Sequence, residues 1–167
     1  MRTPIIVLLS LLLAFSSTAM AGGNTVADTK SPGVKHRVTY PSKLDFEFVK
    51  SAINEAIIEK GLVINNTSHI GAMLQRTGGV VEGAQSIFVK AESYEFCSAT
   101  VSRLTMEADP HNIVFCPYII SVYVLPKEPN KTYISFRKPD IVGSAASKAA
   151  LKEVEKLLRD IIEQAIQ

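Results

Sequence analysis

"EFCSATVSRLTMEADPHNIVFCPYIISVYVL", residues 95–125, contains a helical pattern followed by a strand pattern. Four small or apolar residues of its first half share one helical stripe: Cys97, Val101, Leu104 and Ala108. This stripe predicts a helix that begins at Cys97. Pro110 ends the helix, because helical geometry is disfavoured for the residue before a proline. The run YIISVYVL at 118–125 is rich in β-branched and aromatic residues, so it predicts a strand.

The same two patterns recur on both sides of this segment. Strands are expected at 34–40, 62–66, 86–96, 118–125 and 131–138. Helices are expected after Ser42, after Ser68, at Cys97 and over about 144–166. Ser42 is the expected N-cap of the first helix, since Asp45 follows it at the spacing of a capping box.

The predicted order over residues 34–167 is therefore β-α-β-α-β-α-β-β-α, in a single domain. The loop PKEPN at 126–130 joins the last two strands and predicts a hairpin. A late hairpin with helices elsewhere favours an α+β fold, in which a mainly antiparallel sheet is covered by helices on one face.

The N-terminus has the features of a secretory signal peptide over residues 1–21. Arg2 precedes a short apolar run, and the small residues before Gly22 predict cleavage after Ala21. Residues 22–33, rich in Gly, Ser, Thr and charge, predict a flexible leader. We therefore expect a periplasmic or secreted protein that does not insert into the membrane after cleavage.

The net charge and its distribution along the chain indicate whether a nucleic acid partner is expected. The formal net charge is +2, and it falls to +1 when Arg2 is removed with the signal peptide. Lys and Arg are scattered along the chain, so no nucleic acid partner is expected.

The two cysteines, Cys97 and Cys116, allow two interpretations. In an oxidising compartment they are a candidate disulfide. Alternatively, a cysteine at the start of a helix has a lowered pKa, so Cys97 could serve as a reactive thiolate with Cys116 as its partner. The second interpretation predicts a thiol/disulfide redox protein or a sulfur carrier.

A cofactor site is the other chemical candidate. On the predicted helix after Ser68, His69, Met73 and Arg76 share one face. Imidazole, thioether and thiolate are ligands for copper or haem iron, so His69, Met73 and Cys116 are candidate metal ligands, with haem b as the leading cofactor. Arg76 could hold a propionate, and His111, in the loop before Cys116, completes the candidate set. The alternative is structural: Met73 fills a gap in the core, His69 donates to a carbonyl, and Arg76 is solvated.

Arg103 and Arg137 could together bind an anion. Arg137 alternates with Ile134 and Phe136 in a predicted strand, so we expect it on the surface.

Three segments together resemble the bacterial and archaeal family known as domain of unknown function 302: SHIGAMLQRT at 68–77, the segment at 95–125, and TYISFRKP at 132–139. The resemblance covers residues 34–166 and implies a small α+β sandwich that often forms a homodimer. It implies no established activity.

The sequence contains no P-loop, dinucleotide-binding or nucleophile-elbow motif, so an enzyme is less favoured than a binding protein. We expect an exported binding protein for a small molecule or cofactor. The thiol protein is the alternative.

Overall fold

The computed structural model describes residues 35–81 and 84–167. The predicted signal peptide (1–21) and the predicted leader (22–33) lie outside the described residues. The strands are β1 (Arg37–Ser42), β2 (Val63–Ser68), β3 (Lys90–Cys97), β4 (Tyr118–Val124) and β5 (Thr132–Arg137). The helices are α1 (Phe46–Glu59), α2 (Ile70–Thr77), α3 (Ala99–Ala108) and α4 (Ala145–Ala165), with short 3₁₀ helices η1 (Gly78–Val80) and η2 (Pro110–Phe115). The predicted element order is confirmed.

The five strands form one antiparallel sheet in the order β1-β5-β4-β3-β2. The predicted hairpin of β4 and β5 lies at its centre, and β1 pairs with β5 rather than with its neighbours in sequence. The chain is therefore an α+β protein, as the sequence predicts. The central hairpin also fixes which side chains of distant strands become neighbours.

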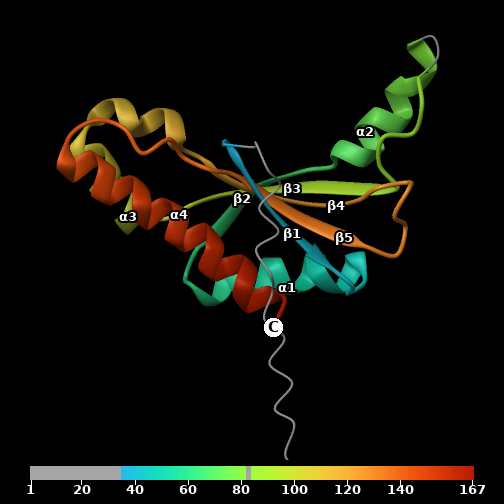
Figure 1. The fold of residues 1–167 in the computed structure, drawn as a ribbon, viewed down its shortest axis with the longest axis horizontal. Helices are drawn as coiled ribbons and strands as arrows, with labels where there is room; N and C mark the ends of the chain where they lie inside the picture. The colour runs from blue at the N-terminus through green and yellow to red at the C-terminus, as the bar shows by residue number, and fades with distance from the viewer. Residues whose placement is uncertain (1–34, 82–83) are drawn as a thin grey trace, which may run out of the picture.

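One face of the sheet carries the hydrophobic core. Its buried side chains alternate along each strand: Val38, Tyr40, Tyr94, Phe96, Tyr118, Ile120, Val122, Val124, Ile134 and Phe136. Helices α1 and α4 lie against this face (Figure 1), and their buried stripes complete the core cluster. Burial of each large aliphatic side chain stabilises the fold by about 1.5–3 kcal/mol. The side chains of this face therefore serve the hydrophobic core.

Helix α2 does not join this layer. It projects away from the sheet (Figure 1), and none of its residues is buried. The first turn of α2 packs closely against β3. At Gly71 the two backbones are so near that an added Cβ would lie only 2.8 Å from the backbone nitrogen of Ala91. The predicted layer of helices on one face is thus built by the other helices, and α2 stands over the end of β3.

Two predicted helix starts are wrong. Helix α1 has Asp45 rather than Ser42 as its N-cap, and Asp45 Oδ1 accepts a hydrogen bond of 2.8 Å from the backbone nitrogen of Glu47. Cys97 does not begin α3. It is the last residue of β3, and Ser98 is the N-cap. Cys97 pairs with Val63 of β2, so it belongs to the strand although the helical spacing of apolar residues begins at Cys97.

The connection from α3 to β4 is fixed by a buried amide. Asn112, in η2, donates to the backbone oxygen of Thr105 at 2.9 Å and to Ser147 Oγ of α4 at 3.0 Å. These bonds hold η2 in place directly before Cys116. No helix within the described ranges combines the length and apolar composition that crossing a membrane requires.

Candidate functional site

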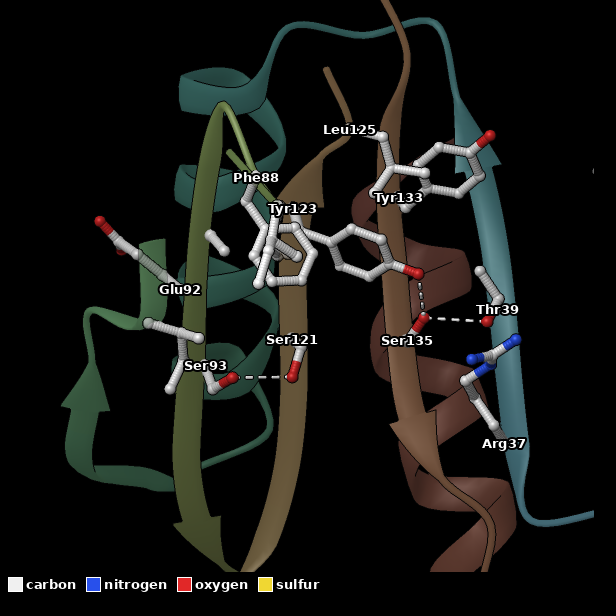
Figure 2. A pocket seen from close by; sticks show the side chains of 14 residues that line it. Arg37, Thr39, Phe88, Glu92, Ser93, Ser121, Tyr123, Leu125, Tyr133 and Ser135 are labelled. Atoms are coloured by element: carbon white, nitrogen blue, oxygen red, sulfur yellow. Dashed lines mark hydrogen bonds between the residues drawn. The ribbon is translucent and has the colours of Figure 1, made fainter. Parts of the chain in front are cut away.

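The second face of the sheet carries polar and aromatic side chains. Strand register arranges them in rows, because residues paired across antiparallel strands project from the same face. One row consists of hydroxyl residues from four strands: Thr39, Ser135, Ser121 and Ser93. Ser93 Oγ lies 2.7 Å from Ser121 Oγ, and Ser135 donates to Thr39 Oγ1 at 2.9 Å (Figure 2).

The next row is aromatic. Tyr123 of β4 and Tyr133 of β5 are register partners whose rings stack, with centroids 5.5 Å apart and an interplanar angle of 16°. Phe88 contacts Tyr123 edge to face at 5.5 Å. The Tyr123 hydroxyl lies 3.1 Å from Ser135 Oγ, so the aromatic row is linked to the hydroxyl row. Figure 2 shows these rings side by side above the sheet.

A cavity of about 600 Å³ lies over these two rows. Part of its wall comes from outside the sheet: Ile70 of α2, together with Ile87 and Phe88 of the segment before β3. Ligand sites typically have volumes of 300–1,000 Å³ and combine apolar walls with a few polar groups. This cavity has both properties.

A cationic row borders the hydroxyl row on the opposite side from the rings. Arg37 of β1 and Arg137 of β5 are register partners, so their side chains leave the sheet from adjacent positions on this face. Both are exposed, and Arg37 lines the cavity. Sequence alternation correctly placed Arg137 on the surface, but it could not show that Arg37 lies beside it.

A charged cluster borders the cavity near α2. Glu92, whose side chain is 13% exposed, lies 3.0 Å from Lys50 Nζ and 3.3 Å from His69 Nδ1. Tyr94, buried beneath it, donates its hydroxyl to Glu92 Oε2 at 2.8 Å. Burial acts to raise the pKa of Glu92, but the hydrogen bonds from Lys50 and Tyr94 outweigh it and lower that pKa. Burial and the adjacent carboxylate raise the pKa of Tyr94, which therefore remains a donor.

The predicted haem or metal ligands do not come together. His69 precedes α2 and pairs with Glu92, whereas Cys116 lies beside Cys97 at the other end of β3. Five residues of strand separate Glu92 from Cys97, a distance of about 16 Å. His69 and Cys116 therefore cannot bind one iron atom in this structure.

The remaining members of the predicted set are also dispersed. Met73 and Arg76 lie on α2, and both are exposed. His111 is exposed in η2. Met73 therefore does not fill a gap in the core, as its structural interpretation required. Within the described part of the chain, no three His, Cys, Asp or Glu side chains gather into a group that could hold a metal ion.

The structure does bring the cysteines together. Cys97 and Cys116 lie near enough for the Cys116 thiol to influence the pKa of Cys97. Cys116 Sγ also lies 3.4 Å from Ser102 Oγ, which lies 3.2 Å from the Tyr118 hydroxyl. Both cysteines are free thiols, so the predicted disulfide is not formed here. Burial raises the pKa of Cys97, and Cys116 raises it further, which contradicts the lowered pKa expected at a helix start.

A second, smaller cavity of about 210 Å³ adjoins Cys116. It is enclosed by the end of η2, the start of β4 and the apolar face of α4, with Arg137 at its border. Cys116 thus lines a small pocket that shares no lining residue with the larger cavity.

The sequence analysis did not identify the residues of the larger cavity. The available signal was the polar half of the strand alternation, Ser121 and Tyr123 in one strand and Tyr133 and Ser135 in the next. Period-2 patterning shows which residues share a face but not what covers it, so the cavity could not be inferred from this alternation.

Comparison with known proteins agrees with the fold. A family model described as "Domain of unknown function DUF302" matches residues 38–167. The chain belongs to this family. The predicted resemblance is therefore confirmed over nearly the whole domain.

One solved structure with the same fold is the crystal structure of an uncharacterized conserved DUF302 protein from Bacillus stearothermophilus. It shares 17% sequence identity with this chain at a TM-score of 0.65, and the alignment covers 79% of this chain and 99% of the other. At this identity the similarity establishes the fold. No curated protein matches the chain significantly.

Proposed function

We propose that this DUF302 protein is an exported, non-enzymatic binding protein that holds a small ligand on the uncovered face of its sheet. The observation that carries the proposal is the cavity of about 600 Å³ over the stacked Tyr123 and Tyr133 rings and the hydroxyl row. Rings stabilise a ligand by stacking and area burial, and fixed hydroxyls give it an orientation. The signal peptide pattern in residues 1–21 supports export.

Haem b remains the proposed cofactor, but at a different place from the one expected. A planar macrocycle with carboxylate groups suits a site with stacked rings and nearby arginines. Of the two tyrosines that line the cavity, Tyr133 donates its hydroxyl to Glu128, so Tyr123 is the one whose phenolate would serve as an axial ligand of haem iron. The proposal therefore replaces the pair of His69 and Cys116 with a site on the sheet.

A haem titration with a cavity-filling variant tests this proposal. Ser121→Tyr places a ring inside the cavity, and Ile119→Tyr adds the same ring on the same strand and face, outside the cavity lining. We expect the wild type and Ile119→Tyr to give the same shifted Soret band when haem is added, and Ser121→Tyr to give none. Equal bands from all three proteins would remove the cavity as the haem site. Native mass spectrometry of the exported protein would identify any other bound molecule.

The thiol protein is the second candidate, supported by the proximity of the two free thiols, Cys97 and Cys116. In the proposed step, the two thiols transfer two electrons and two protons to an external disulfide, which leaves as two thiols, and an S–S bond forms in the protein. Incubation with oxidised glutathione followed by mass spectrometry tests this step. A loss of two hydrogens in the wild type, and a glutathione adduct on Cys97→Ser or Cys116→Ser, would support it. Unreacted wild-type thiols would refute it.

We also propose a homodimer, with α2 and the adjoining residues as the contact. This protruding segment exposes several large apolar side chains: Met73, Val80, Val81, Ile87 and Val89. An exposed apolar group of this size is typical of an interaction surface. Light scattering should give twice the monomer mass, and Val80→Glu with Val81→Glu, both outside the cavity lining, should reduce it to the monomer. A wild-type protein that is monomeric at all concentrations would refute the dimer.

A further inference from the structure

The strongest unexplained feature of the molecule is the pair of arginines on the uncovered face. Arg37 and Arg137 are directly opposite each other on β1 and β5. Side chains at such positions have Cβ atoms about 5 Å apart, and like charges placed there destabilise the pairing. Neither arginine forms an ion pair or hydrogen bond with any other described residue. A bound anion would remove this repulsion.

The position of the pair relative to the cavity indicates the rest of the ligand. On β5, Arg137, Ser135 and Tyr133 follow one another on the same face. The uncovered face thus changes from cationic to hydroxyl to aromatic across three successive rows. Arg137 and Tyr133 are separated by about 13 Å along the strand, a span that an arginine side chain and a ligand of two fused rings can bridge together.

The acidic side chains nearest the cavity lie away from the arginine pair: Glu95 on the uncovered face, and Glu92, which pairs with Val122 on the core side of β3. Glu95 projects from β3 beyond Ile119, about 10 Å from β5 across two strand spacings. Glu92 is engaged by Lys50, His69 and Tyr94 at the opposite border of the cavity. The anionic end of a ligand is therefore favoured at the arginine row and disfavoured near Glu92.

From these rows we infer that the cavity binds an amphipathic aromatic acid, with its acid group held by Arg37 and Arg137 and its ring system on Tyr123 and Tyr133. This inference rests on the proposed function and specifies its ligand class. Guanidinium groups pair with a carboxylate through two parallel hydrogen bonds, and the stacked tyrosines provide a flat apolar surface. Haem, with its propionates, is one member of the class.

Binding of two matched probes tests the inference. 2-Naphthoate has the ring and the acid, and 2-naphthol has the same ring and is neutral at pH 7. By calorimetry, we expect 2-naphthoate to bind one per site and at least tenfold more tightly than 2-naphthol. The naphthoate affinity should fall when salt is raised from 50 to 500 mM, since exposed charge pairs are screened, and the naphthol affinity should stay constant.

Variants of the arginine pair separate the two ends of the site. Arg37→Gln with Arg137→Gln should remove the tenfold advantage of naphthoate and leave naphthol binding unchanged, which also shows that the variant is folded. The control is Arg103→Gln on α3, where the arginine forms an exposed pair with Glu107. This control should bind both probes as the wild type does.

Three results would overturn the inference. If the wild type binds both probes equally, or if the double variant keeps the naphthoate advantage, the arginines do not hold the acid, and the proposed binding function survives without this ligand class. If neither probe binds at millimolar concentration, the aromatic acid is wrong, and the haem titration with Ser121→Tyr then decides separately on the proposed function.

Discussion

Replacing Tyr94 with phenylalanine tests whether Glu92 is held as a partly buried, ionised carboxylate beside the cavity. Tyr94 is 1% exposed, and its hydroxyl donates to Glu92 Oε2 at 2.8 Å. Phenylalanine keeps the ring and its packing and removes this one donor. The perturbation is therefore confined to a single hydrogen bond.

The expected loss of stability is about 2 kcal/mol at pH 7. Hydrogen bonds to charged groups contribute about 1.5–3 kcal/mol, and neutral ones contribute about 1 kcal/mol. With a urea dependence of about 2 kcal/mol per molar, the midpoint of unfolding should fall by about 1 M.

The loss should depend on pH in a defined direction. The pKa of Glu92 is lowered in the folded protein. Its ionised form therefore stabilises the fold above the unfolded value of about 4.3, and this contribution disappears as the pH falls through the lower, folded pKa. At an acidic pH below the folded pKa of Glu92, Tyr94→Phe should cost closer to about 1 kcal/mol, because protonation of Glu92 weakens the hydrogen bond.

Urea unfolding followed by circular dichroism at both pH values measures these losses. Tyr118→Phe is the matched control, since Tyr118 is equally buried and its hydroxyl contacts the neutral Ser102 at 3.2 Å. Burial raises the pKa of Tyr118 to about 12, so this variant should lose about 1 kcal/mol at both pH values. A Tyr94→Phe variant as stable as the wild type, or one with equal losses at both pH values, would show that Glu92 is not an ionised acceptor of this hydrogen bond.

Two further substitutions examine how the site is positioned. Asn112→Ala should lower the free energy of unfolding by about 2–3 kcal/mol, because it removes the buried hydrogen bonds that join η2 to α3 and α4; thermal unfolding measures this, and an unchanged melting temperature would contradict it. Gly71→Ala should loosen α2 from β3, because the new Cβ would lie 2.8 Å from the Ala91 backbone nitrogen. Faster proteolysis within 70–89, at nearly unchanged global stability, is the expected result, and Gly79→Ala, whose Cβ would meet nothing within 4 Å, is the control.

The sequence by itself determined the fold class and the order of the elements. Local patterns were sufficient for this, because the spacing of apolar residues depends on the geometry of one helix or strand at a time. The late hairpin also indicated an antiparallel sheet, and the alternation around Arg137 placed that residue on the surface. The errors lay at element ends, as at Cys97, where hydrogen bonds to a neighbouring strand decide the boundary.

The candidate site was decided by tertiary structure. The placement of β1 beside β5 brings Arg37 next to Arg137, and the register of four strands aligns the hydroxyl row. The same sheet separates His69 from Cys116, which sequence patterns had combined into one metal site. Helical or strand periodicity specifies the face on which a side chain lies. Which side chains of distant segments become neighbours depends on strand order and register, and these are set by packing of the whole core.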